Sequence, residues 1–218
     1  MVCLAGGPSL TQKQADFVRG KARVIAINNA HLMCEWADVL YFPDAPFYRW
    51  HTQGHADIAV KHMGLSAAEV SKRFREFAGQ KCSLDVSNIP DAAVHKLKWA
   101  NNLMWSDDPG VLAKGEHGHA GLQVIQMAAL AGGDPIILLG FDAREPKRGE
   151  KSHWFGEHVK PSPANVYGKY RRSYAIAEPE IKKRGIRIIN ASPGTAIESF
   201  EKMSLEDAFA ACAEPAAA

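Results

Sequence analysis

Short apolar runs alternate with polar, helix-compatible stretches along much of the chain. Five such runs end in small or polar residues: 1–5, 24–27, 39–42, 135–142 and 186–190. Continuous apolar runs of this length are typical of buried strands in a parallel sheet. Amphipathic helical spacing follows the first run and recurs over 122–131. The pattern therefore predicts an α/β fold with a Rossmann-like parallel sheet flanked by helices.

Other parts of the chain are less regular. Residues 45–117 contain scattered Trp, His and Asn, which predicts an irregular middle lobe. Residues 143–165 are rich in charge, His, Gly and Pro, and a loop of that length in a compact domain is often a functional lid, so we expect a lid loop here. A helix is expected over 167–183 with a kink or break at Pro179. The tail 210–218 is expected to be frayed.

Length and composition narrow the class of protein. At 218 residues, with 46% hydrophobic and 23% charged residues, the chain fits a single globular domain over 1–218. A net charge of +2 gives no indication of nucleic-acid binding, although basic residues gather over 144–187, either as a solvated face or near an anionic ligand.

The cysteines and the hydropathy pattern bear on location. The four cysteines form no CxxC pair, so neither a zinc knuckle nor a disulfide framework is predicted. We find neither a signal-peptide pattern nor an apolar run of the roughly 20 residues that a membrane helix needs. A cytoplasmic location is expected, and the oligomeric state stays open, a homo-oligomer included.

The first candidate site is the turn 5–10, Ala-Gly-Gly-Pro-Ser-Leu, which follows the first predicted strand. Two glycines let the backbone approach an anion closely, and the Ser9 hydroxyl with the following amides could hold a phosphate at a helix N-terminus. An ordinary tight turn is the alternative. The chain has neither a GxGxxG fingerprint here nor a Gly-Lys-Ser/Thr motif, which disfavours NAD binding and P-loop chemistry. The phosphate-binding residues predicted in this turn are Gly6, Gly7, Pro8 and Ser9.

Small or polar residues at other predicted boundaries suit the same ligand. Ala120 and Gly121 lie at the start of a predicted helix, where backbone N–H groups can face an anion or form a plain N-cap. Asn28 and Asp44 follow the second and third predicted strands, where they suit ribose or base recognition or simply end the strands. Asp142 closes a buried run and could hold Mg²⁺ through phosphate oxygens.

The segment 152–158, Ser-His-Trp-Phe-Gly-Glu-His, is the candidate catalytic loop. Histidine is the commonest general base at neutral pH, and Glu157 could orient or tune it. The predicted catalytic residues are His158 and His153, with Ser152 near the phosphate. The alternative is a surface loop anchored by its aromatic residues. No HExxH or Cys/His zinc spacing is present, so no metal site is predicted.

Five motifs, taken in order, resemble a family of uncharacterised phage and prophage proteins. They are the turn 5–10, His-Ala-Gly-Leu at 119–122, Ile-Leu-Leu-Gly-Phe-Asp at 137–142, the loop 152–158 and Ile-Asn-Ala-Ser-Pro-Gly-Thr at 189–195. More distantly, the set is similar to the bacterial sialyltransferases that modify lipooligosaccharide. It is also similar to the group of the archaeal 6-hydroxymethylpterin diphosphokinase. The resemblance spans nearly the whole chain except its middle segment.

The sialyltransferase resemblance implies a metal-independent transferase that uses a CMP-type sugar. It places the glycine-rich turn and Asn28 near the nucleotide and makes a loop histidine the general base. His158 matches that base better by its place after Gly156, and His153 is the alternate.

The chain departs from the sialyltransferase pattern at two places. Ala120 stands where those enzymes have Ser, which removes a hydroxyl from the nucleotide site. Glu157 is an extra residue before the histidine. Tyr167 and Tyr170 are the candidates for the tyrosines that hold the leaving phosphate.

The leading prediction is a nucleotide-dependent transferase, with a nucleotide or nucleotide sugar as its partner and no other cofactor implied. One alternative is diphosphate transfer from ATP, in which Asp142 and Asp44 hold Mg²⁺. The other is a non-catalytic phage protein that captures a nucleotide in the cytoplasm of a bacterial host. The donor sugar and the acceptor are left open by the sequence.

Overall fold

A computed structural model describes residues 1–115, 118–158, 163 and 165–213. Residue 213 is described by its backbone only. Its strands are β1 (Val2–Leu4), β2 (Val24–Ile27), β3 (Val39–Tyr41), β4 (Gln80–Leu84), β5 (Val94–Ala100), β6 (Val111–Ala113), β7 (Ile136–Leu139), β8 (Ile188–Asn190) and β9 (Glu201–Lys202). Its α-helices are α1 (Gln12–Val18), α2 (Ala45–Gln53), α3 (Ala67–Arg75), α4 (Ala120–Leu130), α5 (Val166–Lys183) and α6 (Leu205–Ala213). Short 3₁₀ helices span Asn28–Leu32, Ala56–Ile58, Lys61–Met63 and Asp85–Ser87.

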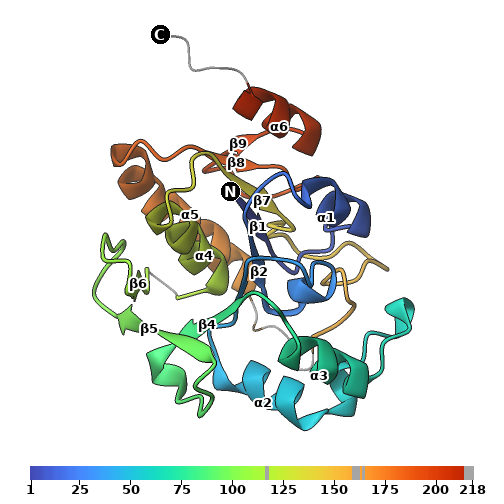
Figure 1. Cartoon of the computed structure of the whole chain (residues 1–218). Helices are drawn as coiled ribbons and strands as arrows, with labels where there is room; N and C mark the ends of the chain where they lie inside the picture. The colour runs from blue at the N-terminus through green and yellow to red at the C-terminus, as the bar shows by residue number, and fades with distance from the viewer. Residues whose placement is uncertain (116–117, 159–162, 164, 214–218) are drawn as a thin grey trace.

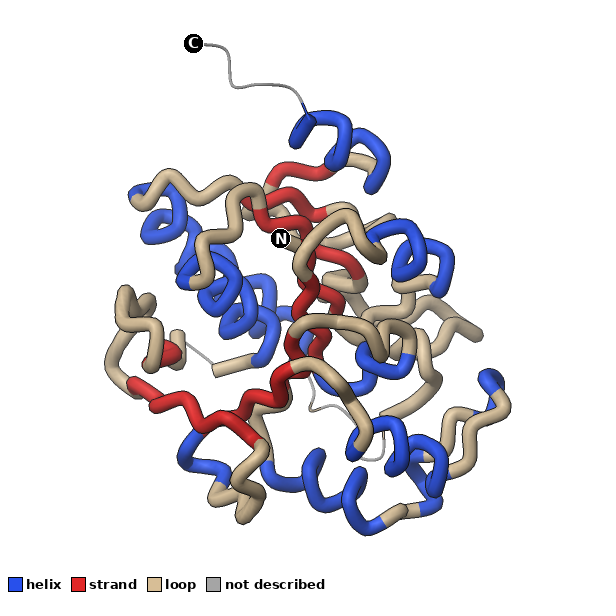
Figure 2. Tube along the Cα trace, in the orientation of Figure 1, coloured by secondary structure: helices blue, strands red, loops and turns tan. Residues whose placement is uncertain are grey.

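The strands of the described residues form one parallel sheet in the order β6-β5-β4-β3-β2-β1-β7-β8-β9. The sheet runs through the middle of the molecule, with helices on both sides (Figures 1 and 2). The predicted α/β, Rossmann-like fold is thus confirmed.

Two apolar cores lie on the two faces of the sheet, because successive strand residues point to opposite sides. In β1, Val2 and Leu4 belong to the core beneath α1, α2, α3 and α6. The residue between them, Cys3, belongs to the other core, which α4 and α5 cover. All three side chains are fully buried. Strands buried on both faces appear in the sequence as nearly continuous apolar runs, as the five central strands do.

The point where the strand order reverses lies between β1 and β7. From β1 the chain builds outward through β2 and β3, and later it returns through α4 to place β7 on the other side of β1. Leu4 is level with Leu139 of β7, so the two strands end side by side. Ligands of open α/β sheets bind in the crevice outside the strand ends at such a point.

The segment 45–117 is more regular than the sequence analysis expects. It supplies α2, α3 and the strands β4, β5 and β6, which extend the same sheet. In β5, buried Val94 and Leu97 alternate with more exposed Lys and His residues, so this strand lacks the continuous apolar run of a central one. Val94 packs in one core and Leu97 in the other, and polar residues separate them, so the sequence shows neither a continuous apolar run nor a regular alternation.

Two smaller expectations also differ from the structure. Helix α5 continues through Pro179 to Lys183, so no break occurs at the proline. Helix α6 continues to Ala213, into the segment expected to be frayed, and residues 214–218 lie outside the described part of the chain.

Candidate functional site

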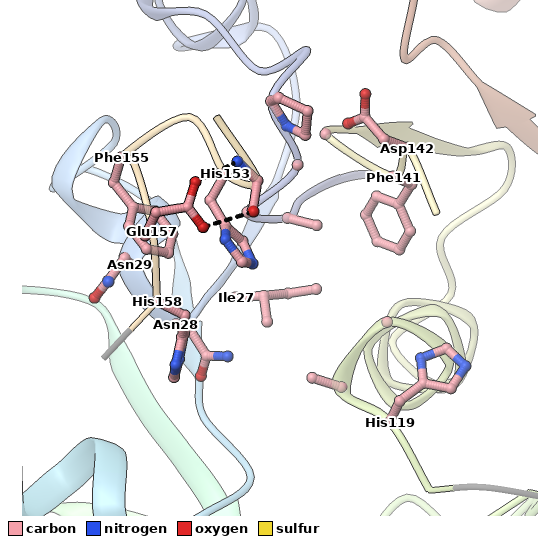
Figure 3. Close-up of a pocket in the computed structure, with 18 of the residues that line it drawn as sticks. Ile27, Asn28, Asn29, His119, Phe141, Asp142, His153, Phe155, Glu157 and His158 are labelled. Atoms are coloured by element: carbon pink, nitrogen blue, oxygen red, sulfur yellow. Dashed lines mark hydrogen bonds between the residues drawn. The ribbon is translucent and has the colours of Figure 1, made fainter. Parts of the chain in front are cut away.

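A cavity of about 210 Å³ opens at the crevice between β1 and β7 (Figure 3). Its wall is assembled from segments far apart in the sequence. These are the turn after β1, residues 27–29 after β2, parts of α2 and of residues 57–60, the start of α4, residues 140–143 after β7, the loop 152–158 and three tyrosines of α5. Most predicted site residues line it, namely Gly6, Gly7, Pro8, Asn28, Ala120, Gly121, Asp142, Ser152, His153 and His158.

The glycine-rich turn is held by close backbone packing. A Cβ on Gly7 would lie 1.9 Å from Asp142 Oδ2 and 2.3 Å from the Gly140 carbonyl oxygen, so only glycine fits. The Gly7 N–H donates to that carbonyl at 2.9 Å, which leaves Gly6 as the residue of this turn whose amide can bind an anion.

Ser9 does not line the cavity, contrary to the sequence prediction. Its hydroxyl donates to Asp142 Oδ2 at 2.8 Å, because the turn folds back over the end of β7. The helix that follows, α1, is capped by Thr11, whose capping box with Gln14 takes the place that the sequence analysis assigns to Ser9.

The start of α4 meets α5 at the cavity. The His119 side chain accepts a hydrogen bond from the Leu122 N–H at 3.4 Å, which leaves the N–H groups of Ala120 and Gly121 at the cavity wall. A Cβ on Gly121 would lie 2.2 Å from the Tyr174 hydroxyl, so glycine is required here as well. The His119 ring packs 4.7 Å from the ring of Tyr170, measured between centroids.

The loop 152–158 is docked onto the glycine-rich turn. The Trp154 backbone N–H donates to the Gly6 carbonyl at 3.2 Å, and the Trp154 ring is buried in the core. His153 and Gly156 exchange two backbone hydrogen bonds of 3.0 Å, and the His153 ring stacks on Phe155 at 4.8 Å. These contacts hold the loop over the cavity as a fixed cover.

The two loop histidines occupy different surroundings. Burial, with a smaller contribution from the nearby His158, lowers the pKa of His153 to about 4, so its ring is neutral at pH 7. The Nδ1 atom of His153 is buried and has no hydrogen-bond partner in the described part of the chain. The His158 ring lies 5.8 Å from Trp50 and 5.9 Å from His153, and it too lines the cavity (Figure 3).

Asn28 and Asn29 line the cavity at the end of β2, next to the glycine-rich turn (Figure 3). Asn28 adopts a left-handed backbone conformation with φ of 49°, which asparagine tolerates better than most residues. Its Oδ1 is buried and makes no hydrogen bond within the described residues. A buried acceptor of this kind calls for a partner, and a bound ligand could supply one.

The two carboxylates predicted as ligands for Mg²⁺ are not brought together. Asp44 caps α2, accepting from the Phe47 N–H at 3.0 Å, and does not line the cavity. The Asp142 side chain does reach the cavity wall, but one of its oxygens is bound to Ser9. Burial raises its pKa above the ordinary value. Among the described residues, no group of three or more His, Cys, Asp or Glu side chains could hold a metal ion.

Part of the wall was not predicted from the sequence. The sequence does not single out Trp50 and Asp57, because they fall in the segment expected to be irregular. Tyr174 was missed too, although its spacing from Tyr167 and Tyr170 places all three on one face of a helix, a signal that was available.

Comparisons of the chain with protein-family models, with curated proteins and with solved structures give no match. The resemblance drawn from the ordered motifs therefore stays a prediction. In the described part of the chain, no helix is long and apolar enough to cross a membrane.

Proposed function

We propose that this chain is a nucleotide-dependent transferase, most similar in chemistry to a sialyltransferase that uses a CMP-type sugar. The observation that carries the proposal is the cavity between β1 and β7, where two glycine-containing turns, a helix start and two histidines converge. Crevices at this position of a parallel sheet are where nucleotides bind.

The anionic part of the nucleotide fits the end of the cavity between the glycine-rich turn and α4. The amide of Gly6 and the N–H groups of Ala120 and Gly121 face this end, and the α4 dipole favours a negative charge there. Tyr170 adds a hydroxyl from α5. Each of these groups donates without needing a metal ion.

The nucleoside fits along Asn28 and Asn29, in line with the place of the second strand end in Rossmann-like sites. The unpartnered Oδ1 of Asn28 would accept from a base amine or a ribose hydroxyl. Trp50 and Phe47 supply aromatic surface on the same side of the cavity. This combination of polar ends and aromatic wall suits a nucleotide better than a wholly apolar ligand.

In the proposed reaction, His158 accepts the proton of an acceptor hydroxyl as that oxygen bonds to the anomeric carbon of the donor sugar. The bond from this carbon to the phosphate oxygen breaks, and the nucleoside monophosphate leaves with the electron pair. We assign the base to His158 rather than His153, because the low pKa of His153 makes it a weak proton acceptor at neutral pH. His153 instead forms part of the fixed cover.

The alternative of Mg²⁺-dependent diphosphate transfer has less support. It needs Asp142 and Asp44 at one ion, and Asp44 caps α2 outside the cavity. Capture of a nucleotide without turnover uses the same cavity and differs only in the role of His158.

The test is turnover of CMP-sialic acid, followed as CMP release by chromatography with and without sugar acceptors. A His158→Ala variant should lose about 10²–10⁴-fold in rate while still binding CMP. His95→Ala, which changes an exposed histidine on β5, is the matched control and should keep the wild-type rate. Tight CMP binding with no turnover, unchanged in His158→Ala, would refute the transferase function and favour a nucleotide-capturing protein.

A further inference from the structure

Two buried histidines lie beside the asparagines of the cavity wall, and one of them, His51, lines the cavity itself. His31 follows Asn28 and Asn29 in the same 3₁₀ helix, and His51 comes from the last turn of α2. Their exposed fractions are 0% and 1%, and their ring centroids lie 5.8 Å apart. Neither histidine takes part in the reaction proposed above.

His31 bonds to the backbone of Asn28. Its Nδ1 lies 2.8 Å from the Asn28 carbonyl oxygen, and since a carbonyl only accepts, Nδ1 carries the proton and donates. Asn28 is the residue with the left-handed φ of 49°. This hydrogen bond fixes the peptide group that follows Asn28 and so helps to hold the backbone at this left-handed position.

His51 bonds to the side chain of Asn29. Its Nδ1 donates to the Phe47 carbonyl at 2.8 Å, and its Nε2 lies 3.0 Å from Asn29 Oδ1. Burial lowers the pKa of His51 to about 4, so the ring is neutral at pH 7 and Nε2 is an acceptor. Two acceptors do not bond, so the neutral ring requires the Asn29 amide to be turned end for end, with its NH₂ group toward Nε2 and its oxygen left for the cavity.

The stability of the fold does not explain why histidines occupy these buried positions. The His31 ring packs against Phe47, Phe74 and Phe77 at centroid distances of 6.2–6.3 Å. Its Nε2 is buried among them with no hydrogen-bond partner in the described part of the chain. A buried unpartnered nitrogen destabilises a fold relative to an apolar side chain of similar size. The hydrogen bonds to the asparagines are the contribution that an apolar residue could not replace.

We propose that His31 and His51 are positioning residues, which fix the backbone of Asn28 and the side-chain amide of Asn29 so that both present polar atoms to the ligand. Neither histidine needs to contact the nucleotide phosphate or the reacting atoms. The inference rests on the proposed function only for the choice of CMP as probe.

The experiment compares four variants with the wild-type chain. His31→Leu and His51→Leu remove the hydrogen bonds at similar volume, and His51→Gln keeps a polar group near the position of Nε2. Phe77→Leu is the matched control, because it alters the same apolar surroundings without touching either asparagine. For each protein, calorimetry gives the Kd for CMP, thermal unfolding gives the Tm, and NMR follows the side-chain amide signals of Asn28 and Asn29.

The two Leu variants should bind CMP at least fivefold more weakly without a matching fall in Tm, and His51→Gln should recover most of the affinity. Phe77→Leu should lower the Tm and leave the Kd unchanged. In the ligand-free protein, the Asn29 amide signals should shift and exchange faster in His51→Leu but not in Phe77→Leu. Unchanged Asn29 signals and an unchanged Kd in His51→Leu would overturn the positioning role. A wild-type chain that binds no nucleotide would refute the proposed function instead, and the ligand-free amide signals would then decide the inference.

Discussion

The same substitution should destabilise the chain strongly at Gly7 and have little effect at the neighbouring Gly6. In Gly7→Ala the new methyl would lie 1.9 Å from Asp142 Oδ2 and 2.3 Å from the Gly140 carbonyl oxygen, so the turn or the end of β7 must move. In Gly6→Ala the nearest atoms are ring carbons of His153 and Phe155, both at 3.4 Å, which is ordinary contact.

The magnitude for Gly7→Ala follows from two terms. Overpacking of a closed site costs about 1–3 kcal/mol, and loss of the hydrogen bond from Ser9 to the Asp142 carboxylate costs about 1.5–3 kcal/mol. A gain of about 0.4–1 kcal/mol from the less flexible unfolded chain offsets part of this loss. We expect a net loss of about 3 kcal/mol in the free energy of unfolding, which lowers Tm by roughly 6–12 °C for a chain of this size.

Urea and thermal unfolding followed by circular dichroism measure both variants. Gly6→Ala should stay within about 1 kcal/mol of the wild type, because its methyl has room and its backbone is not left-handed. If Gly7→Ala is no less stable than Gly6→Ala, the packing of the turn against β7 described above is wrong.

Three further predictions concern protons, metal and the anion site. Burial lowers the pKa of His31 to about 3, below its ordinary value. Below about pH 6.5 the unfolded chain therefore binds a proton at this histidine that the folded chain does not, and the free energy of unfolding falls as the pH drops. Between pH 7 and pH 5 the wild type should therefore lose about 2 kcal/mol more unfolding free energy than His31→Leu in urea titrations, and equal losses would contradict this. EDTA should leave the Kd for CMP unchanged in calorimetry, since Asp44 is outside the cavity, and a loss of affinity on chelation would favour the Mg²⁺ alternative. Tyr170→Phe should slow CMP release by about 10–100-fold, because it removes a hydrogen bond to a charged phosphate. Tyr48→Phe, which changes a tyrosine outside the cavity, should leave the rate unchanged. Equal rates in the two variants would remove Tyr170 from the anion site.

The central part of the fold could be predicted from the sequence because its strands are buried on both faces. β1, β2, β3, β7 and β8 all lie within predicted apolar runs. The outer strands could not be predicted in the same way. In β4, polar Gln80 and Lys81 precede the buried residues, and in β5 charged positions interrupt the apolar ones, so neither shows a continuous run.

The candidate site was predictable where local sequence and topology agree. Gly6, Gly7 and Asp142 follow strands that the topology places side by side, so they had to meet. Ser9 and Asp44 look like ligand-binding residues in the sequence, but their polar atoms are used in hydrogen bonds, Ser9 with the sequence-distant Asp142 and Asp44 with the N-terminus of α2. Polar residues at strand ends serve turns and caps as readily as ligands, and only the packing separates the two roles.

Thermal unfolding of the wild-type chain with CMP, CMP-sialic acid, UDP-sugars, ATP and GTP, each with Mg²⁺ and with EDTA, tests the central claim most directly. The account predicts that the cytidine nucleotides stabilise the chain equally in both conditions. At 100 times its Kd a ligand adds about 2.7 kcal/mol, or roughly 5–11 °C in Tm for a chain of this size. A shift confined to ATP or GTP with Mg²⁺, or no shift with any nucleotide, would contradict the account.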